Sequence, residues 1–113
     1  IVTTNLFGDI LSDLCAGLVG GLGMAPGANI GEDCAIFEAV HGSAPDIAGK
    51  NFANPTSVIL AALQMLEYLE MSDKADKIRN ALIDVIASGD RVTRDLGGTH
   101  GTTDFTEALL ERL

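Results

Sequence analysis

The sequence is poor in basic residues. It contains 7 Lys and Arg against 16 Asp and Glu, which gives a formal net charge of −9. Because phosphate contacts need clustered Lys and Arg, this balance argues against nucleic acid as a partner. It also argues against the chain binding a polyanionic substrate by itself. An excess of carboxylates can instead hold a divalent cation that then receives an anion.

Long apolar runs and cysteines are scarce as well. The longest apolar stretch, residues 58–63, falls far short of the roughly 18–20 residues that span a bilayer, so no membrane partner is expected. Cys15 and Cys34 show neither CxxC spacing nor a pairing framework, which favours reduced thiols that pack as small residues. Hydrophobic residues still make up 47% of the 113 positions, so the chain has enough apolar material for a core.

The sequence does not begin with a methionine. The chain opens with the β-branched stretch IVTT at residues 1–4, which predicts a short strand and a longer protein whose N-terminal part is not included. Residues 5–8 predict a turn. A helix is expected from Asp9 to about Val19, because apolar residues recur there at helical spacing, and glycines follow it. Its apolar stripe is wide for a surface helix, which predicts a subunit interface.

Strands and helices alternate along the rest of the chain, which predicts an α/β fold. A loop is expected over residues 24–33, a strand over 35–40, an irregular loop over 41–55, a short strand over 91–93 and a glycine-rich loop over 95–102. Helices are expected over residues 54–69, 73–88 and 104–113, the second ending at Gly89.

The helix that opens at Asn54 is apolar nearly all round. Asn54 suits its N-cap and Pro55 its first position. A helix without a polar face is expected to be buried, and Tyr68, the single tyrosine, is predicted to be a core residue.

Two carboxylates on the first helix form the first candidate site. Asp9 and Asp13 are four residues apart, so on a helix they share one face. Their charges repel unless a cation lies between them, and Mg²⁺ or Mn²⁺ takes one or two carboxylates together with substrate oxygens and water. The alternative is that Asp9 only caps the helix and Asp13 lies on the surface. The spacing alone leaves both interpretations open.

The loop after the strand at residues 35–40 forms the second candidate site. Loops that follow strands are where α/β folds bind ligands, and two glycines here permit close backbone approach. His41 is equally compatible with a structural role. Three other motifs are excluded: Pro26 stands where a third Rossmann glycine belongs, Gly49-Lys50 has no P-loop spacing, and Ser43 lacks a nucleophile elbow.

Several stretches together resemble the isocitrate and isopropylmalate dehydrogenase family. They read NLFGDILSD at 5–13, GGLG at 20–23, FEAVHGSAPDIAGK at 37–50, ANPT at 53–56 and DLGG at 95–98, in family order. The resemblance covers almost the whole chain. It implies the C-terminal part of a two-domain α/β fold, in which residues 1–31 end the small dimer-forming domain, including the metal-site helix. Residues 32–113 would return to the large cofactor-binding domain.

The resemblance also implies a chemistry. The family oxidises a 2-hydroxy acid to a ketone with NAD or NADP and then removes the β-carboxylate, using Mg²⁺ or Mn²⁺ as Lewis acid. It implies that Asp9 and Asp13 are metal ligands, with a third carboxylate from a neighbouring subunit. It assigns the adenosine part of NAD to His41, Gly42, Ser43, Ala44, Pro45, Asp46, Ile47 and Asn54. The family's acid/base Tyr and Lys lie upstream, so no catalytic residue is assigned here and the chain alone is not expected to be active.

Substrate and cofactor preference depend on two short stretches. MAPGANIG at 24–31 resembles isocitrate dehydrogenases best, whereas GSAPDI at 42–47 is shared with isopropylmalate and homoisocitrate enzymes. Asp46 and Ile47 stand where NADP enzymes of the family have Lys and Tyr, which predicts NAD. Because the stretch at 24–31 resembles isocitrate dehydrogenases best, isocitrate is favoured among tricarboxylate and dicarboxylate hydroxy acids.

The alternatives are a homoisocitrate or 3-isopropylmalate dehydrogenase, a non-catalytic regulatory subunit of a hetero-oligomeric isocitrate dehydrogenase, and a free-standing metal-binding or oligomerisation module. A homodimer or hetero-oligomer is expected, located in the cytoplasm if the source is bacterial and in the mitochondrial matrix if it is eukaryotic.

Overall fold

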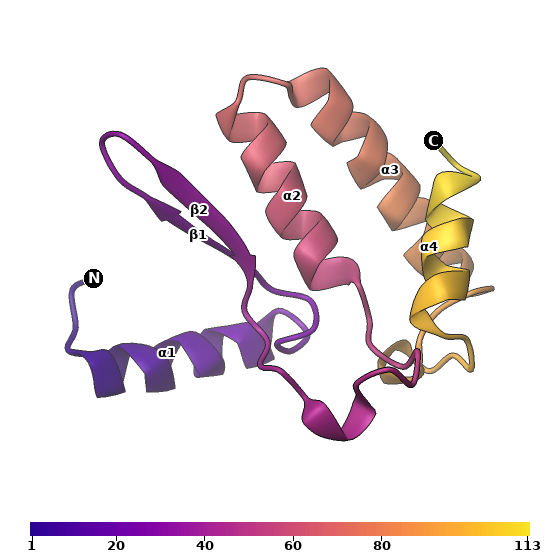
Figure 1. Ribbon diagram of the computed structural model, residues 1–113, viewed down its shortest axis with the longest axis horizontal. Helices are drawn as coiled ribbons and strands as arrows, with labels where there is room; N and C mark the ends of the chain where they lie inside the picture. The colour runs from indigo at the N-terminus through magenta and orange to yellow at the C-terminus, as the bar shows by residue number, and fades with distance from the viewer.

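The computed structural model describes all 113 residues and combines helices with one β-hairpin (Figure 1). The elements in order are α1 (Asn5–Leu18), β1 (Pro26–Ile30), β2 (Ala35–Ala39), the 3₁₀ turn η1 (Pro45–Ile47), α2 (Thr56–Tyr68), α3 (Ser72–Ser88), the 3₁₀ turn η2 (Arg94–Leu96) and α4 (Thr102–Leu110). The α/β class is confirmed. The strands of this segment form a two-stranded antiparallel sheet.

The hairpin corrects the prediction of a loop over residues 24–33. Strand β1 pairs with β2 from Pro26 opposite Ala39 to Ile30 opposite Ala35. The proline and glycines of this stretch predicted a loop because they interrupt most strands. Pro26 is tolerated because it is the first residue of an edge strand, where its missing N–H is not needed by the ladder.

The two other predicted strands do not form. Residues 1–4 have no strand partner in the chain, and α1 begins at Asn5, four residues before the predicted start. The N–H of Gly8 donates to the carbonyl of Thr4 at 2.9 Å, which closes the first turn. Residues 91–93 lead into η2 instead of a strand, although Val92 and Thr93 are buried. A β-branched stretch makes a strand only where a partner supplies the ladder.

The core lies between α3, α4 and the segment that joins them. Its residues are Ala81, Leu82, Val85, Val92, Phe105, Ala108 and Leu109. Helix α3 buries Ala75, Ala81, Leu82 and Val85, and its predicted end at Gly89 is confirmed by a left-handed φ of 68°.

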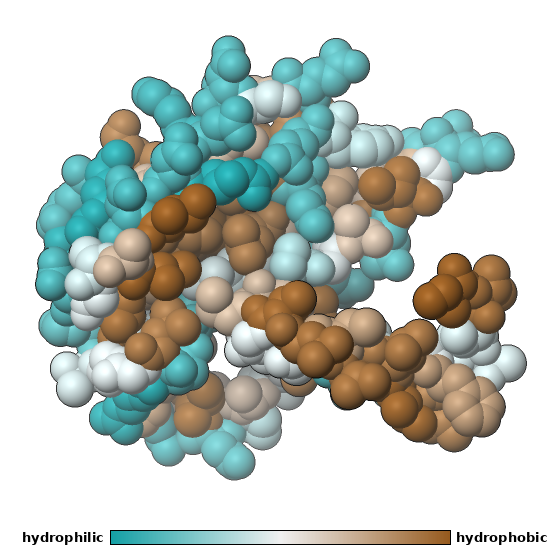
Figure 2. All heavy atoms as spheres, turned by 180° about the vertical axis from the view of Figure 1, so that it is seen from behind, coloured by the Kyte–Doolittle hydropathy of each residue, from teal (hydrophilic) through white to brown (hydrophobic).

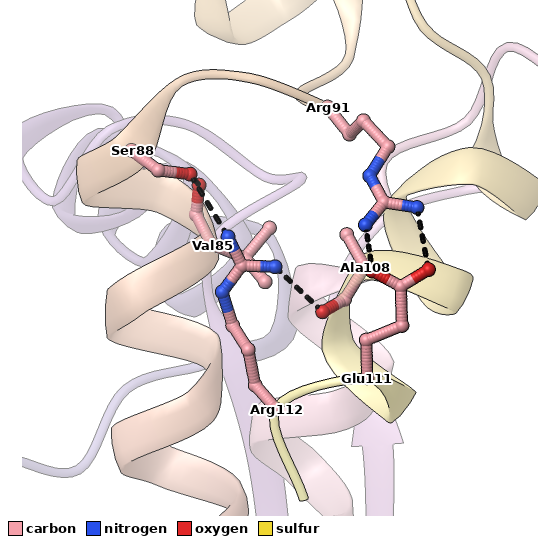
Figure 3. A network of polar contacts seen from close by, with 6 residues as sticks. All are labelled: Val85, Ser88, Arg91, Ala108, Glu111 and Arg112. Carbon is pink, nitrogen blue, oxygen red and sulfur yellow. Dashed lines mark hydrogen bonds and ion pairs between the residues drawn. The ribbon is translucent and has the colours of Figure 1, made fainter.

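Polar contacts join the outer ends of α3 and α4 (Figure 3). Arg91 forms an ion pair with Glu111, and Arg112 donates to the carbonyl of Ala108 at 2.8 Å and to Ser88 Oγ at 3.4 Å. The hydrogen bond from Arg91 holds the pKa of Glu111 below its ordinary value. The C-terminal helix is therefore attached at its outer end as well as through the core.

Helix α2 lies between the hairpin and α3 (Figure 1). The prediction that it is buried nearly all round is wrong for this chain, because only Thr56, Ser57, Ala61 and Leu63 are buried. Tyr68 is 46% exposed and is not a core residue; its ring packs against that of Phe37, with the centroids 5.7 Å apart. Ile59 and Leu60 pack against the core from α2, whereas Val58, Met65 and Leu69 are exposed.

Helix α1 extends away from the other helices (Figure 1), and Ala16 is its one buried residue. Figure 2 shows its apolar surface as a continuous brown band. The exposed large apolar residues of α1 and its end are Leu6, Phe7, Ile10, Leu11, Leu14, Leu18 and Val19. None of the four helices combines the length and apolar character that a membrane crossing requires.

Candidate functional site

The loop between β2 and α2 borders the main pocket of the molecule. The pocket has a volume of about 500 Å³ and is lined by Gly23, His41, Gly42, Ala44, Ile47, Phe52, Ala53, Asn54, Arg94 and Asp95. Three segments that are distant in sequence meet here: the turn after α1, the 41–54 loop and η2. A volume of roughly 300–1,000 Å³ is typical of a small-molecule or cofactor pocket.

The first half of the loop turns sharply after β2. Ala44 has a left-handed φ of 42° immediately before Pro45, which opens η1. The Nδ1–H of His41 donates to the carbonyl of Gly42 at 2.9 Å, so its ring is held against its own backbone. This geometry brings His41, Ala44 and Ile47 to the same pocket wall.

Asn54 connects the loop to both α2 and η2. Its Oδ1 accepts the N–H of Thr56 at 2.9 Å, and its Nδ2 donates to Asp95 Oδ2 at 2.8 Å. The helix begins one residue later than predicted, with Pro55 at the N-cap and Thr56 as the first helical residue, and Asn54 bonds to the N–H of Thr56 from the position before the cap. Thr93 Oγ1 donates to the other oxygen of Asp95. Both oxygens of this carboxylate are therefore held in place at the pocket wall.

Arg94 and Phe52 contribute a charged and an aromatic group to the same pocket. The guanidinium carbon of Arg94 lies 4.3 Å from the centroid of the Phe52 ring. This distance is within the range of a cation–π contact, which orients a long, exposed side chain. The pocket thus combines aromatic surface, an amide, a carboxylate and a cation.

The sequence predicted part of this lining and missed part. His41, Gly42, Ala44, Ile47 and Asn54 lie together as predicted. Ser43 lines an adjoining hollow of about 340 Å³. Pro45 and Asp46 lie on η1 with their side chains exposed and outside the lining of either space.

Four lining residues were not predicted as binding residues: Gly23, Phe52, Ala53 and Asp95. Gly23, Ala53 and Asp95 do lie in the family-like stretches GGLG, ANPT and DLGG, whereas Phe52 gave no signal of its own. Arg94, the tenth lining residue, was not assigned to the binding site either. Periodicity cannot reveal contacts of this kind, because Asn54 and Asp95 are 41 residues apart.

Asp9 and Asp13 lie on the same helix, four residues apart, so both carboxylates are on one face of α1. Both are exposed, and neither carboxylate has a hydrogen bond or an ion pair within the chain. No set of three potential metal-ligating side chains gathers anywhere in the chain. The pair fits a Mg²⁺ or Mn²⁺ site in which substrate, water or another polypeptide supplies the remaining ligands.

Comparison with known proteins places the chain in a family. A family model described as isocitrate/isopropylmalate dehydrogenase matches residues 1–109. The chain therefore belongs to the isocitrate/isopropylmalate dehydrogenase family.

Similar proteins include isocitrate dehydrogenase (NAD) catalytic subunit 5, mitochondrial, of Arabidopsis thaliana, which is 57% identical over the whole chain; the chain covers 30% of it. An isocitrate/homoisocitrate dehydrogenase of Thermus thermophilus is 60% identical over the whole chain, which covers 34% of it. The chain thus spans about a third of the length of these relatives.

A solved isocitrate dehydrogenase from Methylococcus capsulatus is similar in structure, with a TM-score of 0.89 and 57% identity; the match covers 96% of this chain and 32% of that one. A β-decarboxylating dehydrogenase from Thermococcus kodakarensis gives a TM-score of 0.81 at 42% identity, covering 96% of this chain and 32% of that one.

The two roles of Asn54 generate a prediction. Asn54→Ala removes the hydrogen bond to the first N–H of α2 and the contact with Asp95, and we expect it to lower the free energy of unfolding by about 1 kcal/mol. Asn54→Ser keeps a side-chain oxygen able to cap the helix but is too short to reach Asp95. Chemical denaturation of the full-length protein should therefore show most of the stability recovered in the Ser variant. Equal losses in both variants would contradict the capping role.

Proposed function

We propose that this chain is part of an NAD-dependent isocitrate dehydrogenase, which oxidises isocitrate and releases its β-carboxylate as CO₂. Membership of the family and relatives named isocitrate dehydrogenase support the reaction. The observation that carries the proposal is the pocket of about 500 Å³ bordered by the 41–54 loop. In this proposal the chain contributes the adenosine site of NAD and two of the metal carboxylates.

The cofactor site uses the groups that the loop presents. His41–Ile47 and Asn54 would hold the adenosine part of NAD, and the bound cofactor would supply the hydride acceptor for the oxidation. The carboxylate of Asp46 accepts hydrogen bonds from the ribose hydroxyls, as acidic residues do in other dinucleotide sites. Because Asp46 is exposed on η1, it is free to reach a ligand that extends beyond the pocket.

The metal site uses α1. Asp9 and Asp13 hold Mg²⁺ or Mn²⁺ together with a carboxylate of a neighbouring subunit. The bound cation supplies Lewis-acid stabilisation of negative charge on the substrate oxygen. Both carboxylates lack a partner within the chain, so their charge is available to a cation. The net charge of −9 also agrees with substrate-binding cations elsewhere in the protein.

The assembly that this site requires is an oligomer. We propose that the exposed apolar face of α1 lies in a subunit interface of a homodimer or hetero-oligomer. Residues 1–31 would end the small dimer-forming domain and residues 32–113 would belong to the cofactor-binding domain. The protein would act in the cytoplasm of a bacterium or in the matrix of a mitochondrion.

Two alternatives remain within the family. One relative is named isocitrate/homoisocitrate dehydrogenase, which favours homoisocitrate as second candidate substrate, ahead of 3-isopropylmalate. A regulatory subunit without activity is the other alternative. The presence of both aspartates and of the whole 41–54 loop favours the catalytic form.

The metal site is tested by Asp9→Asn in the full-length protein. Loss of a charged ligand should lower turnover by about two orders of magnitude and raise the Mn²⁺ concentration needed for half-maximal activity. Titration calorimetry with Mn²⁺ alone should show weaker Mn²⁺ binding by Asp9→Asn, and this measurement does not depend on turnover. Asp84→Asn, at an exposed position of α3, is the matched control. An Asp9→Asn, Asp13→Asn variant with normal activity at low metal would remove this assignment.

The cofactor preference is tested by steady-state kinetics with NAD and NADP. A carboxylate at position 46 faces the 2′-phosphate of NADP, and we expect kcat/KM to favour NAD by about 100-fold or more. The double variant Asp46→Lys, Ile47→Tyr should reduce this ratio. The prediction is wrong if the wild type uses both cofactors equally, or if the double variant leaves the ratio unchanged.

The interface is tested by Leu18→Glu. Leu18 is 81% exposed in the chain, so the change costs little within the fold but places a charge in an apolar contact. We expect the oligomer to dissociate at low micromolar concentration in analytical ultracentrifugation. Ile83→Glu, an equally apolar, exposed position on α3, should leave the oligomer intact. An intact Leu18→Glu oligomer would contradict the interface.

A further inference from the structure

The first ten residues of the 41–54 loop and the residues that follow them differ in how they are bonded to the rest of the chain. All hydrogen bonds made by residues 41–50 are local, within the loop itself. The first bonds that join the loop to another element are made at Asn51. Its carbonyl accepts the N–H of Thr102 at 3.1 Å, and its Oδ1 accepts the N–H and the Oγ1 of Thr103, each at 2.9 Å.

The backbone at this junction suits a small set of residues. Asn51 has a left-handed φ of 58°, a conformation that Asn and Gly adopt far more readily than other residues. Opposite it, a β-carbon on Gly101 would lie 2.5 Å from the carbonyl oxygen of Asn51 and 2.3 Å from its Nδ2. The loop and the N-terminus of α4 therefore meet at a distance that only glycine permits.

The junction stands immediately before the pocket. The next three residues, Phe52, Ala53 and Asn54, all line the pocket. A second contact supports the same strip, because Thr102 Oγ1 donates to the carbonyl of Ala53. The position of the strip relative to Arg94 and Asp95 thus depends on how Asn51 is held on α4.

We propose that Asn51 is a positioning residue for the dinucleotide: by fixing the loop to the N-terminus of α4 it holds the NAD-binding strip in its binding-competent form. The inference rests on the proposed function, since the ligand is the NAD assigned there. Asn51 touches neither the reacting atoms nor the metal carboxylates of α1. Its loss therefore weakens cofactor binding without impairing the chemical step.

The first experiment measures kinetics of the full-length protein. Asn51→Ala removes two side-chain hydrogen bonds and disfavours the left-handed φ, so KM for NAD should rise about tenfold. The kcat at saturating NAD and the KM for isocitrate should change less than about twofold. Asn51→Asp, which keeps the acceptor oxygen, should restore the KM for NAD. Gly101→Ala, which pushes α4 away from Asn51, should raise it.

Two controls separate positioning from general stability. Asn80→Ala makes the same change at an exposed position of α3 and should leave every constant unchanged. Arg91→Ala breaks the ion pair at the other end of α4 and should lower stability without moving the KM for NAD. Should Asn51→Ala not fold, Asn51→Gly keeps the φ, loses only the acceptor and carries the same expected rise.

The second measurement is independent of turnover. Hydrogen exchange of the 41–53 segment should be faster in Asn51→Ala and Gly101→Ala than in the wild type, and calorimetry with NAD should show the same weakening as KM. Wild-type protein that neither binds nor reduces NAD refutes the proposed function. Wild type that does both, with the KM unmoved in Asn51→Ala, refutes only the positioning role. The positioning role is also refuted if kcat of Asn51→Ala falls by as much as its kcat/KM, or if hydrogen exchange of residues 41–53 is unchanged in this variant.

Discussion

The candidate cofactor site depends on how the segment between α3 and α4 is attached to the core. Val92 and Thr93 are buried, and the carbonyls of both accept hydrogen bonds from the returning backbone, from His100 at 3.2 Å and from Gly98 at 3.0 Å. A β-carbon on Gly98 would lie 1.9 Å from the carbonyl oxygen of Val92. This tight loop presents Arg94 and Asp95 to the pocket. The positions of these two side chains therefore depend on how the preceding residues pack in the hydrophobic core.

The core and the pocket are therefore parts of one arrangement. Phe105 is fully buried in α4, in the cluster that also contains Val92. The same helix begins at the threonines that hold Asn51. Consequently α4 supports the pocket from two sides, through the buried segment before η2 and through the loop before α2. The pocket-lining groups on three separate segments are held together because a single helix supports two of these segments.

Helix periodicity could be recognised from the sequence, whereas strand pairing and distant contacts could not. The inward stripe and glycine end of α3 follow from local pattern alone, and both are present. Strand β1 was missed because its ladder is supplied by β2, which outweighs the local signal of Pro26. The β-branched residues 1–4 illustrate the reverse case, in which strand propensity finds no partner in the chain.

Burial was the other property that local pattern predicted poorly. An apolar helix such as α2 was expected to be buried all round, but burial depends on how many neighbours surround it, and here only two sides are covered. The candidate site shows the same limit. His41, Ala44 and Ile47 share a short loop and could be grouped by position, whereas the contact of Asn54 with Asp95 exists only because η2 folds back beneath the loop.

The two candidate sites differ in how much of their geometry the chain provides. The pocket has its walls, its oriented carboxylate and its braced loop within residues 23–103. The two aspartates of α1 have a shared helix face but no surrounding ligands, and their helix buries a single residue. A cation held by two exposed carboxylates is bound weakly, because water competes for every open coordination position. The proposed cofactor site is thus formed largely within this chain, whereas the proposed metal site would have to be completed by groups from outside it.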